Sequence, residues 1–425
     1  MELLAGPAGG RYNPATSVAG RRPISVGWTL LPRLDVTQID TTLRPWLLRH
    51  VCEFWKQRII DPSGGFFEEL DLTGEPVRLR TRTTLVQARL TYVFSHAFWL
   101  TGDPDFRGAA AHGYEFLCDR CRAPDGSGFY RAVDGDGRVV DCCRDAYDQA
   151  FVLFAMAWFA RICHSAGPLD IAKETLCFMQ AHLADGRHGG FLEEWLPGRQ
   201  DLKLPRRQNP HMHLLEATLA LFTTSGEVVW LRHSSDLIEL MLTRFVDRQT
   251  GSLIEFFASD WQPAAGPPGR WREPGHHFEW VWLLLEFMRR SGDRTISDQA
   301  ARLFEFGTRF GIEREGTVAG AVFDGVDAGG VLLAGTKLFW PQMEFIKACL
   351  ARYETLGDKN AWPLIVRHLE LILTSFLRPD GATWYNQLAR DGTPMSVTTP
   401  ARVLYHLFLA FAELDRVRPS NGARC

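Results

Sequence analysis

Apolar stretches of helical character alternate along this chain with short glycine-led segments. Each segment opens with glycine, continues into a few β-prone residues and ends at Gly, Asp or Pro, as a small hairpin or extended loop would. Six such segments occur, at residues 64–77, 126–140, 189–198, 251–263, 316–330 and 381–395. The pattern predicts a mainly α protein whose helices are separated by short β-hairpins.

A helix is expected after every one of these segments, and its start recurs at a nearly constant interval. The six starts fall near Arg82, Arg144, Asn209, Gly275, Lys337 and Thr399, at intervals of 62, 65, 66, 62 and 62 residues. A second helix completes each unit, over 41–58, 104–122, 168–183, 228–247, 294–311 and 358–378. The junctions "TGD", "SGE", "SGD" and "LGD" read as glycine C-caps followed by a new helix start. Such a period is typical of a repeat built from helix pairs.

Helix pairs that follow one another without a linker predict one domain, because each pair has to bury its apolar side against its neighbours. We expect six units to close into an (α/α)6 barrel, a toroid of six inner and six outer helices with the hairpins at its mouth. An open superhelix of stacked pairs is the alternative, but it usually carries polar capping repeats, and none is evident. The expected boundaries are a loose leader over 1–25, the barrel over 26–418 and a tail over 419–425.

The composition limits which binding partners and which cellular compartment we expect. The 425 residues carry a net charge of −3 and no long basic run, so we expect neither nucleic acid nor an anionic membrane as a partner. No run approaches the roughly 18 apolar residues that a spanning helix needs. The N-terminus lacks the apolar core of a secretory signal, and the nine cysteines show no CxxC pairing. A cytoplasmic protein with reduced thiols is the expectation.

Polar residues form one stripe on each predicted inner helix, near its start. Residues three, four and seven positions apart share a helix face. The stripes contain Arg82 and Arg89; Arg144, Tyr147 and Asp148; Asn209, His213 and Glu216; His276 and Glu279; Lys337, Trp340 and Glu344; Arg402 and His406. Burying such groups is costly unless they face a wet cavity or partners. With 14 Trp and 28 Phe in the chain, the stripes predict a polar pocket ringed by aromatic side chains, which suits a sugar.

Several kinds of site are compatible with these side chains. Zinc is one, because "HMH" and "HH" resemble ligand clusters, although i,i+2 spacing splays side chains apart and neither HxxxH nor HExxH occurs. A glycosidase that uses Glu216 and Glu279 is a second, and a structural or sugar-binding helical scaffold is a third. Three imidazoles beside arginines favour instead the removal and return of a proton near neutral pH. Arg89 would then stabilise the enediolate oxygen.

Six motifs resemble the N-acylglucosamine 2-epimerase superfamily. They are "QAR" (87–89), "DAYDQAF" (145–151), "NPHMHLLEA" (209–217), "PGHHFEW" (274–280), "WPQMEFIKA" (340–348) and "LYHLF" (404–408). The resemblance implies an (α/α)6 barrel with sugar isomerase or 2-epimerase activity, in a superfamily that includes cellobiose 2-epimerases, mannose isomerases and sulfoquinovose isomerases. The stretch "RTRTTLVQARLTYVFSHA" looks most like the mannose isomerase branch.

The resemblance also implies roles for individual residues. His276 and His406 would be the acid/base pair at C1 and C2 of the sugar, and His213 would help to open its ring. Glu279 would orient His276, and Arg89 would hold O1 and O2 of a cis-enediol, while His277 would be support or surface. The implied substrate-binding residues are Asn209, Tyr147, Trp340, Trp384, Glu216, Glu344 and Arg402.

The implied reaction is the conversion of D-mannose to D-fructose through a cis-enediol, without a metal or cofactor. N-acylglucosamine 2-epimerase and cellobiose 2-epimerase activities are alternatives; an inverting glycosidase or a non-catalytic sugar-binding barrel is a more remote one. The expected partner is a monosaccharide or disaccharide, and the expected state a monomer or homodimer. Arg270 and Arg272 lie in a loop expected at the mouth, where they could meet an anionic substituent. No Walker-type loop is present, which does not exclude a nucleotide effector.

Overall fold

Six inner helices are the central feature of the computed structural model, which describes residues 34–199 and 205–418. Each inner helix packs against the next one in the chain, and the last packs against the first. They are α3 (Thr84–Thr101), α5 (Ala146–Cys163), α7 (Asn209–Ser225), α10 (Pro274–Ser291), α12 (Phe339–Leu356) and α14 (Leu404–Val417). All begin within five residues of the predicted starts, so the mainly α fold is confirmed.

Outer helices pack against the inner ones, and α1, at the start of the described chain, packs against α14 at its end. They are α1 (Ile39–Pro45) continuing through η3 (Trp46–Cys52) into α2 (Glu53–Ile59), α4 (Pro104–Phe116) with η4 (Leu117–Cys121), α6 (Gly167–His182), α8 (Val228–Leu240) with η5 (Met241–Phe245), α11 (Ser297–Phe310), and α13 (Ala361–Leu371) with η6 (Ile372–Phe376). The segments η3, η4, η5 and η6 are π-helical turns, which add one residue to a turn of helix.

Glycine ends four of the inner helices at the predicted junctions. Gly102, Gly226, Gly292 and Gly357 adopt left-handed backbone at the C-caps of α3, α7, α10 and α12, with φ between 68° and 76°. Residues with a Cβ adopt this conformation at a cost, whereas glycine does not. The chain can therefore turn sharply from each of these inner helices into the outer helix that follows.

Short antiparallel strands lie at the end of the ring where the inner helices begin, which we call the mouth. The paired strands are β2 (Thr81–Thr83), β3 (Ala132–Asp134) and β4 (Val139–Asp141); β5 (Arg144–Asp145) and β6 (Glu194–Trp195); β7 (Arg206–Arg207) and β8 (Phe256–Phe257); β9 (Gly325–Val326) and β10 (Leu332–Ala334); β11 (Lys337–Leu338) and β12 (Gln387–Leu388); β1 (Glu69–Asp71) and β13 (Thr398–Pro400). Short helical turns complete the described elements: η2 (Val36–Gln38), α9 (Pro267–Arg270) and η7 (Ala401–Val403).

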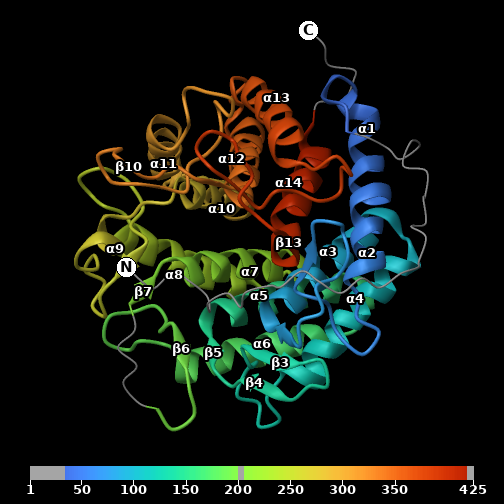
Figure 1. Cartoon of the computed structure of the whole chain (residues 1–425). Coiled ribbons are helices and arrows are strands. Elements are labelled where there is room, and N and C mark those ends of the chain that lie inside the picture. The colour runs from blue at the N-terminus through green and yellow to red at the C-terminus, as the bar shows by residue number, and fades with distance from the viewer. Residues whose placement is uncertain (1–33, 200–204, 419–425) are drawn as a thin grey trace, which may run out of the picture. The chain divides into compact units, whose positions relative to one another are not determined.

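The ring closes through β1 and β13, which belong to opposite ends of the described chain. Leu70 pairs with Thr399 in this ladder, and the Ala401 N–H donates to the Glu68 carbonyl at 2.9 Å. In Figure 1 the red α14 accordingly lies beside the blue α1 and α3. The predicted closed barrel is confirmed, and the open superhelix is excluded.

All six hairpins use the same register. An isolated bridge joins the end of each outer helix to its hairpin, and its hairpin members are Phe66, Phe129, Phe191, Leu253, Val322 and Trp384. The inner helices fix this position through one recurrent side chain. Gln87, Gln149 and Gln342 each accept the N–H and donate to the carbonyl of their bridge residue, and the Nε2 atoms of His211 and His277 accept the N–H of theirs. We call these five residues the latches.

The register also determines the surroundings of Trp384, one of the predicted substrate-binding residues. Trp384 is fully buried and stacks between Trp55 and Phe339, with ring centroids 5.2 Å and 5.1 Å away. It occupies the bridge position, where the other repeats also carry an apolar side chain. Trp384 therefore packs among the aromatic side chains of the core, and its role in lining the cavity stays a prediction.

The predicted leader and tail, residues 1–25 and 419–425, lie outside the described residues. Among the helices that the structure describes, none is both long enough and apolar enough to cross a membrane.

Candidate active site

Two layers of side chains surround the axis of the barrel, and both follow from the latch positions. Two residues after the latches come Arg89, Phe151, His213, Glu279 and Glu344; three residues further come Tyr92, Phe154, Glu216, Trp282 and Lys347. The spacing of three keeps each pair on one helix face. The two layers approach each other around Tyr405 of α14, whose ring centroid lies 5.3 Å from that of Phe151 and 5.6 Å from that of Tyr92.

Three buried histidines are each held through Nδ1 by a carboxylate. Nδ1 of His213 lies 3.1 Å from Glu216, that of His276 lies 2.9 Å from Glu255, and that of His406 lies 2.7 Å from Glu344. No described residue bonds to the three Nε2 atoms. Because a hydrogen bond at one ring nitrogen fixes the orientation and tautomer of the other, the Nε2 atoms remain for a substrate.

Two acidic residues surround His276. Its Nδ1 lies 2.9 Å from Glu255 and 3.2 Å from Glu273. Burial opposes the charged imidazolium, but these carboxylates outweigh it and raise the pKa of His276 to about 10. Glu279, which was predicted to orient His276, makes no hydrogen bond among the described residues; its nearest imidazole nitrogen is Nδ1 of His213, at 4.0 Å. Glu255 holds His276 instead.

Helical spacing could not predict the role of Glu255, because this residue lies in a hairpin and not on an inner helix. It occupies the position two residues after the bridge residue, where Glu68, Glu193 and Asp324 also carry a carboxylate. Each of the four accepts a backbone N–H from the segment that leads into the next inner helix. Alignment of the six hairpins would have found this recurrent acid. Only in the fourth repeat does it also reach an active-site histidine.

His406 has the opposite electrostatic setting. Burial, with contributions from Arg89 and Lys347, holds its pKa well below the ordinary range, so its imidazole is neutral. The ring of Trp340 lies 4.9 Å from that of His276 and 5.6 Å from that of His406. A charged and a neutral imidazole therefore approach the same half-buried indole.

Arg89 connects α3 to α5 and α14. Its guanidinium donates to the hydroxyl of Tyr147 at 2.7 Å and to the carbonyl of Arg402 at 2.9 Å. It also lies over the rings of Phe151 and Tyr405, at 4.1 Å and 4.9 Å. The Tyr147 ring is 5.0 Å from that of His213, so the structure brings the predicted oxyanion-binding arginine close to the predicted ring-opening histidine.

Two further predicted binding residues lie at the ends of inner helices. Asn209 begins α7, and its buried Oδ1 has no hydrogen-bond partner among the described residues. Arg402 lies in η7 with an exposed side chain, and no described carboxylate forms an ion pair with it. Both groups retain bonding capacity that a ligand could use.

His277 is fully buried, and both of its ring nitrogens are engaged. Nδ1 donates to the Glu273 carbonyl at 2.8 Å and Nε2 accepts from the Leu253 N–H at 2.9 Å. Burial lowers its pKa to about 4. Of the two predicted roles, support and surface, the structure therefore shows support.

The loop arginines have protein partners. Arg272 is 4% exposed, bonds Ser252 at 3.0 Å and pairs with Asp247 at 3.4 Å. Arg270 is exposed and pairs with Asp327 at 3.0 Å. The predicted encounter with an anionic substituent is therefore not favoured for Arg272, which stabilises its own loop.

The site contains groups that a divalent cation could use. Potential ligand atoms lie within 4.8 Å of one another in the sets His213–Glu216–Glu279, Glu255–Glu273–His276 and Glu279–Glu344–His406. Histidine and carboxylate ligands suit zinc. Nδ1 of each histidine is, however, already within hydrogen-bond distance of a carboxylate, so a metal bound through Nδ1 would have to displace that contact.

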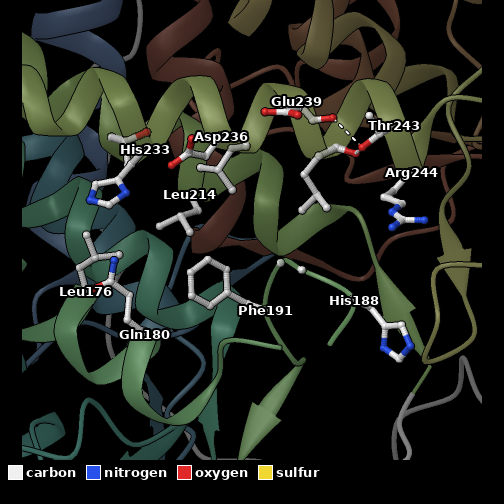
Figure 2. Close-up of a pocket in the computed structure, with 15 residues that line it drawn as sticks. Leu176, Gln180, His188, Phe191, Leu214, His233, Asp236, Glu239, Thr243 and Arg244 are labelled. Atoms are coloured by element: carbon white, nitrogen blue, oxygen red, sulfur yellow. Dashed lines mark hydrogen bonds between the residues drawn. The ribbon is translucent and has the colours of Figure 1, made fainter. Parts of the chain in front are cut away.

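A separate cavity of about 450 Å³ lies between α6 and α8, beside the hairpin that carries Phe191 (Figure 2). Leu176 and Gln180 of α6 and His233, Asp236 and Glu239 of α8 line it. None of the predicted site residues contributes to its wall, so it does not belong to the candidate active site.

Buried histidine–carboxylate pairs inside an (α/α)6 barrel are a site that could transfer protons, and the barrel is of the sugar isomerase and epimerase class. The sequence profile of the N-acylglucosamine 2-epimerase (GlcNAc 2-epimerase) family matches residues 65–410, and the chain belongs to that family.

Two relatives and a solved structure support this assignment. A mannose-6-phosphate isomerase of Rhizobium meliloti (strain 1021) is 34% identical over 398 residues, which are 90% of this chain and 98% of the relative. A D-mannose isomerase of Marinomonas mediterranea is 25% identical over 79% of this chain and 86% of its own length. The crystal structure of a D-mannose isomerase covers 90% of this chain and 99% of its own, with a TM-score of 0.81 and 22% identity, which shows a shared fold.

Proposed function

We propose that this chain is an aldose–ketose isomerase that converts D-mannose to D-fructose through a cis-enediol, with histidines as acid and base. The observation that supports this most directly is the pairing of His276 and His406 around Trp340. Nε2 of each has no partner among the described residues, and carboxylates favour the charged form of His276 while burial favours the neutral form of His406. An acid and a base set apart in this way are what a proton transfer between adjacent carbons needs.

The reaction would proceed on the open-chain sugar, which His213 helps to form. Nε2 of His406 takes the proton from C2, and the electron pair forms the C1=C2 bond while O1 becomes an enediolate oxygen. Arg89 stabilises that charge. The proton of the C2 hydroxyl passes to O1, His276 gives a proton to C1, and O2 becomes the ketone oxygen. Exchange with solvent then restores both histidines.

Proton NMR of D-mannose in deuterium oxide tests this proposal. The expected product is fructose with deuterium at C1. Deuterium at C2 of mannose or glucose would indicate 2-epimerisation, the alternative outcome of the same enediol. N-acetylglucosamine and cellobiose would be tested in parallel, and a wild-type protein that exchanges no proton of any of these sugars would contradict the proposal.

A second candidate substrate is mannose 6-phosphate. The relative with 34% identity carries that substrate in its name, and the exposed Arg402 lies beside Arg89 with no ion-pair partner among the described residues. If the phosphorylated sugar is the substrate, kcat/KM for mannose 6-phosphate should exceed that for mannose, and Arg402→Met should reduce only the former. If kcat/KM for mannose 6-phosphate does not exceed that for mannose, and Arg402→Met changes neither value, the result would favour mannose itself.

The proposed chemistry needs no metal, and a chelator tests this point. Treatment with EDTA followed by gel filtration should leave the rate of isomerisation unchanged. Loss of activity that zinc restores would instead assign one of the histidine–carboxylate sets to a metal.

A further inference from the structure

Lys347 is a fully buried lysine of α12, three residues after Glu344, the carboxylate that holds His406. Its Nζ lies 2.7 Å from Oε2 of Glu344 and 4.1 Å from the ring centre of Trp282. The proposed reaction gives it no role, and burying an ammonium is costly unless its surroundings compensate.

Its surroundings carry more negative than positive groups. Glu344, Glu279 and Glu216 all act on its charge and, despite burial, raise the pKa of Lys347. The titratable groups that face it are Glu216 from α7, Glu279 from α10, Glu344 from the same helix, and Tyr405 and His406 from α14, with Tyr92 and Arg89 of α3 further along the axis. Lys347 thus stays charged.

Glu344 lies between Lys347 and His406. Oε1 is 2.7 Å from Nδ1 of His406, and Oε2 is 2.7 Å from Nζ of Lys347. The pair has two forms that differ by one proton. In the first, the neutral imidazole carries its hydrogen on Nδ1, Glu344 is a carboxylate and Nε2 of His406 offers a lone pair. In the second, Glu344 has taken up a proton from solvent and donates it from Oε1 to Nδ1, and the hydrogen of the imidazole is on Nε2.

Only the first arrangement makes His406 a base toward the substrate. We propose that Lys347 is a positioning residue that holds Glu344 as a carboxylate and thereby keeps the proton of His406 on Nδ1. This inference rests on the proposed function in one respect, because it assumes that Nε2 of His406 receives the substrate proton.

The pKa of Glu344 is raised well above its ordinary range, first by burial and then by Glu279, and the ammonium of Lys347 makes the largest of the contributions that lower it. The carboxylate form therefore depends on Lys347, whose Nζ lies 2.7 Å from Oε2. Replacing the ammonium by an apolar group would leave Glu344 and Glu279 as buried, uncompensated carboxyl groups. Glu344 would then take up a proton and change the tautomer of its partner.

The test compares Lys347→Met with the wild type by ¹⁵N NMR of histidine-labelled protein at neutral pH, without substrate. The signals of His406 are assigned by difference from His406→Asn. We expect the wild type to show a protonated Nδ1 and an unprotonated Nε2, and Lys347→Met to show the reverse. We also expect kcat to fall on the order of 10² to 10⁴-fold, as when a catalytic histidine is left in the wrong tautomer, with KM little changed. Lys347→Arg, which keeps the charge, should retain the wild-type tautomer.

Lys337 provides a matched control. It is equally buried, but it lies at the mouth, where Nζ donates to the carbonyls of Gly335 and Arg390 and pairs with Glu313 at 3.6 Å. Lys337→Met should lower stability without altering the His406 signals. If Lys347→Met does not fold, Lys347→Gln carries the same test.

An unchanged His406 tautomer in a folded, neutral Lys347 variant would overturn the inference. The NMR result is independent of turnover. A tautomer that changes, in a protein whose wild type has no isomerase activity, would support the inference and contradict the proposed function. An unchanged tautomer in a variant that keeps isomerase activity would contradict the inference and leave the proposed function supported.

Discussion

His276 and His277 follow each other in the chain but point to different sides of α10, since successive helical residues are about 100° apart. Nδ1 of His276 contacts two carboxylates and its Nε2 bonds no residue in the described part of the chain, while both nitrogens of His277 bond the backbone. The difference in pKa between these neighbours, about 10 against about 4, follows from these partners. The chemistry of each imidazole is therefore set by what contacts it.

Substitution of His277 should affect stability more than catalysis. Gln87, Gln149 and Gln342 perform the same latching in other repeats, so His277→Gln should keep both fold and turnover. His277→Ala leaves the buried Leu253 N–H without its acceptor and should cost about 1 to 3 kcal/mol of unfolding free energy. Chemical denaturation and kcat measure the two effects, and loss of turnover in a folded His277→Gln protein would contradict this reading.

The two proposed catalytic histidines should be indispensable. His276→Asn and His406→Asn should each lower kcat by about 10² to 10⁴-fold, because each removes one end of the proton transfer. Far-ultraviolet circular dichroism should be unchanged. A near-wild-type rate in either variant would remove that residue from the mechanism.

His276 should also make stability depend on pH. Its pKa is raised from 6.5 to about 10 in the folded protein, so its contribution is complete below about pH 6.5 and is lost as pH rises toward 10. Between these values the unfolding free energy of the wild type should fall more steeply than that of His276→Asn. Parallel stability curves for the two proteins would show that the imidazolium is not stabilised in this way.

At the scale of the elements, four of the hairpins use the same acidic position for the same structural purpose. Glu193 accepts from the Arg207 N–H at 2.6 Å and pairs with its guanidinium at 2.7 Å. Glu255 accepts from the Glu273 N–H at 3.3 Å and additionally holds His276. A position that joins a hairpin to a helix in four repeats thus also orients a proposed catalytic histidine in one of them.

Glu193→Gln and Glu255→Gln form a matched pair that separates these two roles. Both should lower the unfolding free energy by about 1 to 3 kcal/mol, since each weakens a buried charged hydrogen bond. Only Glu255→Gln should lower the pKa of His276, followed by NMR titration, and reduce kcat. Equal kinetic effects in both variants would indicate that the hairpins act on the site only through general stability.

The helices and hairpins could be predicted because a period of about sixty residues is visible in the sequence, and it placed His213, His276 and His406 correctly on the inner helices. The partner of His276 could not be predicted in the same way. Helical spacing relates residues within one helix, whereas Glu255 lies 21 residues before His276 in a hairpin. The packing of Trp384 could not be predicted for a related reason, since the face of a hairpin residue depends on a register that only the bridges reveal.

At the scale of the barrel, closure joins segments that are far apart in the sequence. β13 pairs with β1, and α14 packs between α12 and α3. Most of α14 is buried, including Tyr405 and Phe408 with exposures of 0%. An open array gains stability from each neighbouring repeat in turn, but a closed ring loses two interfaces when a single inner helix is missing.

Truncation after residue 397 should therefore abolish cooperative folding and not merely subtract one repeat. It removes β13, η7 and α14, and it therefore exposes the apolar faces of α3 and α12 that pack against α14. It also deletes Tyr405, whose hydroxyl donates to Glu216. Thermal unfolding followed by circular dichroism, with binding of an apolar dye, should show a broad transition and exposed apolar surface. A chain ending at residue 418 keeps all of these elements and is the control. A sharp transition in the shorter chain would mean that the units fold as an open stack, independently of closure.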